Sequence, residues 1–204
     1  MMKKSPDRPG EFLREGRRLF VSKGFGSTTI EDIVTAVGVG KGTFYSYFRD
    51  KADLLLQLIH QSFLELAACT HARRARARTP EQHLEYAFRA QVDYLRQQPD
   101  LLNILEQVKI PYFDQINTSF VQAMKHEIAE LVQQIEMQQR SGRWRSICPH
   151  NLLGVMMVSI HVLLIKELKF GCPVQPSEIR DVLAVYLHGL SIPTPAPAPR
   201  RKKP

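Results

Sequence analysis

The chain has 204 residues, enough for one ordinary domain or two small ones, and its 44% hydrophobic and 24% charged content excludes a disordered or fibrous protein. The net charge of +8 lies at the two ends. Residues 1–51 carry 10 basic and 6 acidic side chains, residues 52–192 carry 14 of each, and residues 193–204 carry 4 basic ones. Basic end segments favour an anionic partner, such as nucleic acid or a membrane surface.

The cysteines and the apolar segments indicate the cellular compartment. Cys69, Cys148 and Cys172 are widely spaced and odd in number, which argues against a disulfide framework and favours a reducing cytoplasm. The N-terminal segment lacks the apolar stretch of a signal peptide. The longest apolar run, residues 152–165, has 14 residues, whereas a bilayer span needs about 20. We therefore expect a cytoplasmic protein with no membrane segment.

Apolar residues recur at helical spacing, which predicts an all-α fold of about nine helices. In chain order, helices are expected up to about residue 23, over 30–37, over 40–48 and from 50 into the 70s, and then over 80–97, 101–109, 113–139, 150–170 and 176–189. Thr28 or Thr29 is the expected N-cap of the second helix, and Gly38 ends it. Three short helices with a tight glycine turn predict a helix-turn-helix domain over residues 8–51.

The third expected helix combines a buried and a polar side. Val39, Phe44 and Phe48 should point inward and fix this helix on the second. That leaves outside a set of side chains with hydrogen-bonding tips: Lys41, Thr43, Tyr45, Ser46 and Tyr47. Such tips suit phosphate and base-edge contacts. Gly40 and Gly42 each cost a helix about 0.8–1 kcal/mol relative to Ala, and close approach to a duplex explains their presence.

This stretch resembles the N-terminal DNA-binding domain of TetR-type transcriptional regulators over about residues 10–60. The matching residues are Gly24-Phe25, Thr28-Thr29, Ile33-Val34, Gly38-Val39, Gly42-Thr43-Phe44-Tyr45, Tyr47-Phe48 and Lys51. The sequence departs from the family at Gly40, where Ser or another polar residue is more frequent, and at Val34, where Ala is usual. The departure at Gly40 leaves the base preference open.

The resemblance implies a role for each matching position. It assigns Thr29 and Lys51 to phosphates and places the third helix in the major groove of double-stranded DNA. The resulting DNA-binding set is Thr29, Gly40, Lys41, Thr43, Tyr45, Ser46, Tyr47 and Lys51. The alternative is that Tyr45 and Tyr47 only cover the surface of a small domain.

For residues 52–192 the resemblance implies a ligand-binding domain that dimerises through its last two helices. The sequence supports dimerisation independently, because the helix over 150–170 is apolar nearly all the way round and needs cover on two sides. A central helix buried within one monomer is the alternative. Candidates for the wall of a pocket for an uncharged or weakly charged small molecule are Phe63, Leu66, Phe88, Tyr112, Phe113, Trp144, Met156, Met157 and His161. Each of these could equally be an ordinary core residue.

Two basic clusters stay open to more than one interpretation. Arg73, Arg74, Arg76 and Arg78 lie near the end of the fourth helix, where cations suit the helix dipole, or they could attract DNA or an anionic ligand. The Pro-rich tail over 193–204 could attract DNA or keep the chain end soluble.

The sequence offers no nucleophile–base pair, phosphate-binding loop or metal-ligand spacing, so we expect no enzyme activity, cofactor or metal. The function that these features indicate is a dimeric repressor that binds a pseudo-palindromic operator and is released by a small-molecule effector. An activator, or a small-molecule-binding protein with a vestigial helix-turn-helix, is the alternative.

Overall fold

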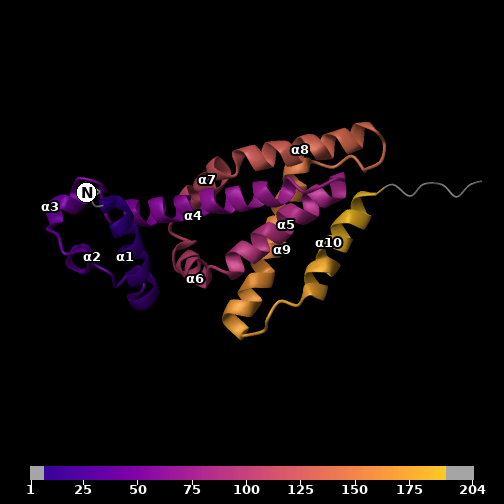
Figure 1. Ribbon diagram of the computed structural model, residues 1–204. Coiled ribbons are helices and arrows are strands. Elements are labelled where there is room, and N and C mark those ends of the chain that lie inside the picture. The colour runs from indigo at the N-terminus through magenta and orange to yellow at the C-terminus, as the bar shows by residue number, and fades with distance from the viewer. Residues whose placement is uncertain (1–6, 192–204) are drawn as a thin grey trace, which may run out of the picture.

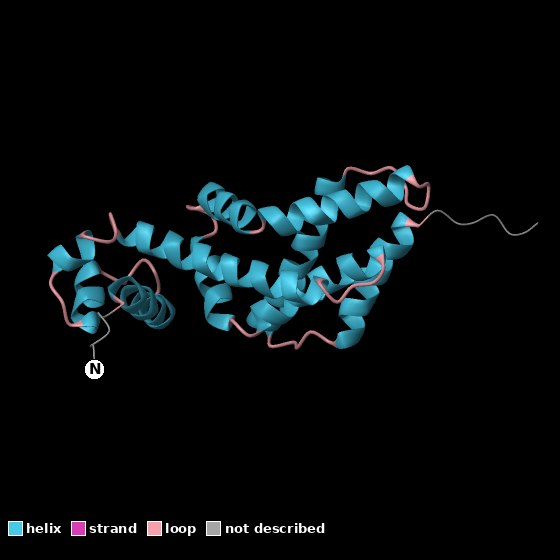
Figure 2. Cartoon of the chain, turned by 45° about the horizontal axis from the view of Figure 1, so that its top comes forward, coloured by secondary structure: helices cyan, strands magenta, loops and turns pink. Residues whose placement is uncertain are grey.

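The computed structural model describes residues 7–191, which contain ten α-helices and no β-strand (Figures 1 and 2). The helices are α1 (Arg8–Lys23), α2 (Ile30–Val37), α3 (Lys41–Tyr45), α4 (Lys51–Arg74), α5 (Pro80–Arg96), α6 (Pro99–Val108), α7 (Phe113–Ala123), α8 (Lys125–Arg140), α9 (Pro149–Phe170) and α10 (Pro176–Leu190). The all-α prediction is confirmed. The tail over 193–204 lies outside the described residues.

Helices α1, α2 and α3 gather at one end of the molecule, and the long helix α4 leads from them to the other helices (Figure 1). We call α1–α3 the head and α5–α10 the body. The core of the head also includes Leu54, Leu55 and Leu58 of α4 and Ile104 of α6. The packing of the head therefore continues past residue 51 into the helix that joins it to the body.

Local signals explain how α2 is set in place. Thr29, rather than Thr28, is its N-cap: the Thr29 hydroxyl accepts a hydrogen bond from the backbone N–H of Asp32 at 3.1 Å, and the Asp32 carboxylate accepts one from the backbone N–H of Thr29 at 2.9 Å. This is a capping box. The Thr28 hydroxyl is buried and donates to the carbonyl of Gly24 at 2.8 Å. Gly38 ends α2 in the left-handed conformation, with φ of +75°, which glycine adopts without strain.

Helix α3 has only five residues, so the predicted span of 40–48 was too long. Tyr47 and Phe48 still donate to the carbonyl of Phe44 at 3.0 Å, in a turn that leads the chain away to α4. The ring of Phe12 in α1 lies edge-on to those of Phe44 and Phe48, with centroids 5.5 and 5.8 Å apart. All three rings are buried. This aromatic cluster fixes a helix too short to be stable by itself.

The single helix predicted over 113–139 is wrong: the chain forms α7 and α8, with a break at Met124. Met124 has φ of −91° and ψ of 5°, outside the helical range, and its side chain is buried. Neither glycine nor proline lies at the break, so no residue type predicts it. The break accounts for the tenth helix.

Helix α9 is apolar over most of its 22 residues, and by length and composition alone it could cross a membrane. Its buried side, which includes Leu152, Met156, Ile160 and Leu164, packs in the body core with residues of α5 and α10. Val155, Val158, Val162 and Phe170 of α9 are exposed.

A buried ion pair closes the far end of α4. The Arg74 guanidinium donates to the Glu127 carboxylate of α8, and each side chain is 3% exposed. Arg73 pairs with Asp93 of α5, while Arg76 and Arg78 are exposed. Half of the arginine cluster thus joins α4 to its neighbours within the body.

We predict that Glu127→Ala lowers the free energy of unfolding by about 3 kcal/mol, because it removes the buried partner of Arg74 and leaves this buried charge with the more exposed Glu130 carboxylate alone. The control is Glu136→Ala, also on α8, which removes an exposed pair with Arg140 and should cost at most about 1 kcal/mol. Urea unfolding measures both. Equal losses in the two variants would contradict the role given to the Arg74–Glu127 pair.

Acid should weaken the start of α2. Hydrogen bonds from the Lys23 side chain and from Thr29 hold the pKa of Asp32 at about 2, below its usual value of about 3.9. A lowered folded-state pKa means that the ionised carboxylate stabilises the fold above about pH 4 and that this contribution disappears as the pH falls toward 2. The urea midpoint of Asp32→Asn should therefore lie below that of the wild type at pH 5 and approach it at pH 3. For Asp181→Asn, an exposed control on α10, we expect no such pH-dependent difference.

Candidate nucleic-acid interface and ligand cavity

The outer side of α3 carries the polar set expected from the sequence. Tyr45 and Tyr47 are 55% and 45% exposed. Lys41 and Ser46 are exposed and Thr43 is half-buried. Phe44 and Phe48 point into the head as expected, so the side chains between them are directed outward. The exposed rings offer flat surfaces and phenol hydroxyls that can meet a groove.

Gly40 and Gly42 flank Lys41 at the start of α3. The φ of Gly40 is −83°, and a Cβ added at either position would meet nothing within 4 Å. The free chain therefore does not need glycine at these two positions for its own backbone or packing. What the glycines provide is a bare backbone, which lets a partner approach closely.

Lys41 is already engaged within the protein. Its ammonium lies 2.7 Å from the Glu31 carboxylate of α2, and both side chains are more than half exposed. The hydrogen bond to Glu31 raises the pKa of Lys41. Lys41 is therefore paired with a carboxylate in the free chain, and its remaining N–H donors face solvent.

Lys51 has a different environment from the other basic residues of the interface. Its ammonium donates to the carbonyls of Phe25 and Thr28, each at 2.6 Å, and to that of Gly26 at 3.3 Å. It also lies 4.5 Å from the centre of the Phe25 ring. Burial lowers the pKa of Lys51. An ammonium has three N–H donors, so the loop before α2 occupies all of them.

The hydroxyl of Thr29 is likewise used inside the protein, since it accepts from Asp32 N–H and donates to the Asp32 carboxylate at 2.9 Å.

Arg49, which was not among the residues expected from the sequence, directly follows Phe48 and has an 85% exposed side chain. Asp53, at 3.4 Å, is its partner. The signal that could have found Arg49 is its place directly after Phe48, on the same loop as the exposed tyrosines.

A cavity of about 260 Å³ lies in the body between α5, α7, α8 and α9. Its wall is mostly apolar, and Met124, at the break between α7 and α8, forms part of it. The lining residues are Leu84, Ala87, Phe88, Gln91, Asn117, Phe120, Val121, Met124, Glu127, Ile128, Leu131, His150, Leu153, Gly154, Met156, Met157 and Ile160. Of the nine pocket candidates from the sequence, Phe88, Met156 and Met157 lie on this wall.

The structure places the other six candidates elsewhere. Phe63 and Leu66 are buried in the core that α4 shares with the head, and Tyr112 packs edge-on against Phe25 at 5.8 Å. Phe113 is 62% exposed, Trp144 is buried beside the end of α10, and His161 faces Glu106 at 3.4 Å. The polar wall residues Gln91, Asn117, Glu127 and His150 were missed, because they come from four helices whose packing the sequence does not reveal.

Comparison with known proteins identifies the head. The sequence profile of a family described as "Bacterial regulatory proteins, tetR family" matches residues 12–58. A segment of 44 residues is 46% identical to an uncharacterized HTH-type transcriptional regulator, YerO, of Bacillus subtilis, and covers 22% of this chain but only 15% of that protein. The HTH-type transcriptional repressor DhaR of Mycobacterium sp. is 23% identical over 148 residues, which are 72% of this chain and 75% of DhaR.

The fold as a whole also has solved counterparts. A TetR family transcription regulator from Marinobacter aquaeolei VT8 superimposes with a TM-score of 0.70 at 18% identity, over 90% of this chain and 95% of that one. At this identity the similarity concerns the fold. The profile match shows that residues 12–58, the head with the start of α4, are similar to the tetR family of bacterial regulatory proteins.

Proposed function

We propose that this protein is a dimeric transcriptional repressor that reads a pseudo-palindromic operator with α3 and leaves it when a small molecule fills the cavity. One observation supports DNA binding above the others: Lys41, Tyr45 and Tyr47 stand outward on α3 and the turn that follows it, and Phe44 and Phe48 anchor both. A short, firmly held helix with hydroxyl and ammonium tips fits the major groove.

Within this proposal the DNA-binding part covers residues 8–51, and residues 52–192 bind the ligand and the second copy. Thr29, Gly40, Lys41, Thr43, Tyr45, Ser46 and Tyr47 form the DNA surface. We assign Lys51 a positioning role in place of the phosphate contact that the family resemblance implies, because loop carbonyls occupy its ammonium. We add Arg49 as a candidate for a phosphate contact. Such a protein would act in the cytoplasm.

We infer repression, rather than activation, from the name of the relative DhaR, which is a transcriptional repressor. We infer binding of a small molecule from the apolar cavity.

Two routes join that cavity to the head. Phe120 of the wall packs edge-on against Phe63 of α4 at 5.3 Å, and α4 begins at Lys51. The second route is α6, which packs against the wall helices α5 and α9 and whose Gln107 side chain accepts from the backbone N–H of Phe25 at 3.0 Å. A ligand that moves α4 or α6 would therefore displace the loop before α2.

A row of valines supports dimerisation. Val155, Val158 and Val162 follow one another at helical spacing on α9 and are 55–61% exposed, and Val185 of α10 is 72% exposed. An apolar surface of this kind on two adjacent helices marks a contact site. Two copies joined there would present their α3 helices to half-sites about one turn of DNA apart, roughly 34–36 Å.

We predict that replacing Lys41 changes the salt dependence of DNA binding and that replacing Lys51 does not. Lys41→Met should weaken operator binding and reduce the slope of log K against log salt by about one, because one phosphate loses its counter-charge. Lys51→Met should weaken binding to all sequences while leaving the slope unchanged, because it loosens the loop over residues 25–28. Fluorescence anisotropy with labelled duplex across a salt series measures both.

The control for this pair is Lys125→Met, an exposed lysine on α8, which should change neither affinity nor slope. A reduced slope for Lys51→Met would restore the phosphate role to that residue. If Lys41→Met and Tyr45→Ala, each made singly, both bind the operator with the affinity of the wild type, α3 does not contact DNA.

The dimer prediction concerns the valine row. The wild type should sediment as a dimer, and Val158→Glu or Val162→Glu should convert it to monomers, because each places a charge in an apolar contact. Leu64→Glu, at a 49% exposed apolar position on α4, should leave the dimer intact. A monomeric wild type, or dissociation by the Leu64 variant alone, would contradict dimerisation through α9 and α10.

A further inference from the structure

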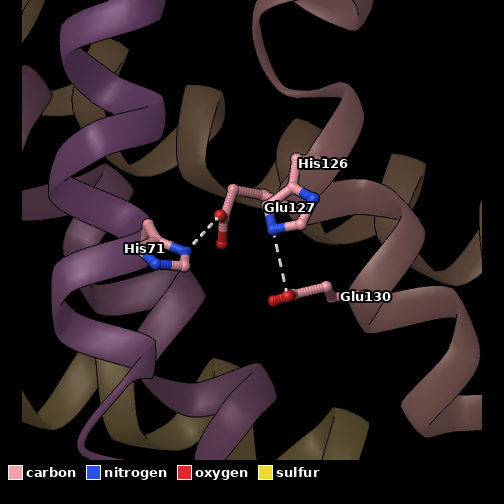
Figure 3. Close-up of side chains that lie close together, drawn as sticks. All are labelled: His71, His126, Glu127 and Glu130. Atoms are coloured by element: carbon pink, nitrogen blue, oxygen red, sulfur yellow. Dashed lines mark hydrogen bonds and ion pairs between the residues drawn. The ribbon is translucent and has the colours of Figure 1, made fainter.

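Four metal-ligating side chains meet where the end of α4 faces the start of α8. They are His71 from α4 and His126, Glu127 and Glu130 from α8 (Figure 3), and one ligand atom of each lies within 4.8 Å of the others. Tetrahedral zinc holds its nitrogen and oxygen ligands at about 2.0–2.2 Å, which places them about 3.3–3.6 Å from one another. Binding would therefore draw the most distant ligand atoms together by about 1 Å, which rotation of the exposed histidine side chains can supply.

Each histidine faces one carboxylate oxygen. His71 Nδ1 lies 2.9 Å from Glu127 Oε1, and His126 Nε2 lies 3.1 Å from Glu130 Oε1. In both pairs the atoms that share a proton are atoms that can bind a metal. Replacing the two shared protons by one cation would convert the pairs into a single site with two nitrogen and two oxygen ligands.

The second oxygen of both carboxylates is bound to the same residue. Arg74 Nη1 contacts Glu127 Oε2 and lies 3.1 Å from Glu130 Oε2. The guanidinium thus binds the Oε2 atoms of both carboxylates and orients their Oε1 atoms toward the two histidines, as outer partners of metal ligands do. With neutral imidazoles, two carboxylates against one guanidinium leave one excess negative charge, which a divalent cation offsets.

The burial of the four ligands also suits an ion that enters from solvent. Glu127 is 3% exposed, whereas the side chains of His71 and His126 are 58% and 72% exposed. One carboxylate is fixed deep in the protein, and two exposed imidazoles can close over the ion from outside. Sequence spacing does not reveal this cluster, because His71 lies 55 residues before His126.

We propose that His71, His126, Glu127 and Glu130 bind one divalent transition-metal ion of the zinc, cobalt or nickel class, which favours imidazole and carboxylate ligands. The ion joins α4 to α8 beside the cavity that Glu127 also lines. The site is independent of DNA binding, and its test requires no DNA.

The test uses the tag-free full-length chain with Co²⁺ as a spectroscopic probe and Zn²⁺ in competition with a chromogenic chelator. We expect one ion per chain, visible cobalt bands of a nitrogen–oxygen site and a zinc-dependent rise in unfolding temperature. His71→Ala and His126→Ala should each weaken zinc binding at least about tenfold, a loss that even outer partners of a metal can cause. Both histidines are exposed, so these variants should fold.

His188→Ala, an exposed histidine on α10 outside the cluster, is the matched control and should bind zinc like the wild type. The proposal is overturned if the wild type binds no ion at one per chain or if the double variant His71→Ala/His126→Ala binds as tightly. Cobalt bands of thiolate ligation would also overturn it, because they would assign the ion to the exposed cysteines.

Discussion

The packing of Phe44 and Phe48 against Phe12 is the contact on which the rest of the structure depends. A helix of five residues has no independent stability, and α3 contains glycine at its second position. The orientation of Tyr45 and Tyr47 therefore comes entirely from the rings beside them. Loss of one such buried ring costs a protein about 3–5 kcal/mol of stability. The same aromatic contacts therefore stabilise the head and orient Tyr45 and Tyr47.

Helix α4 extends this dependence to the body. At its start Lys51 holds the loop before α2, at its middle Phe63 meets the wall of the cavity, and at its end Arg74 is buried with Glu127. The helix packs against α1, α5, α7 and α8 and keeps an exposed stripe that includes Gln57, Gln61 and Leu64. A change at the cavity or at the Arg74 end therefore acts on the same helix that holds the loop before α2.

The head could be predicted from its sequence more completely than the body could. Its helices are marked by local signals, such as the Thr29 cap and the left-handed Gly38, and its inward and outward residues alternate clearly around Phe44. The body depends on contacts between distant helices. No residue type marks the break at Met124, and the meeting of Arg74 with Glu127 or of His71 with His126 follows only from the packing of α4 on α8. Even in the head, the loop carbonyls around Lys51 needed three-dimensional information.

Selection from a random duplex library tests the central claim, that α3 reads DNA as part of a dimer, most directly. The full-length protein should enrich an inverted repeat whose half-sites lie about one helical turn apart, roughly 34–36 Å. A single enriched half-site would contradict the paired arrangement. Recovery of no motif, with no binding to any duplex at low ionic strength, would contradict the assignment of α3 to DNA and favour a protein that only binds small molecules.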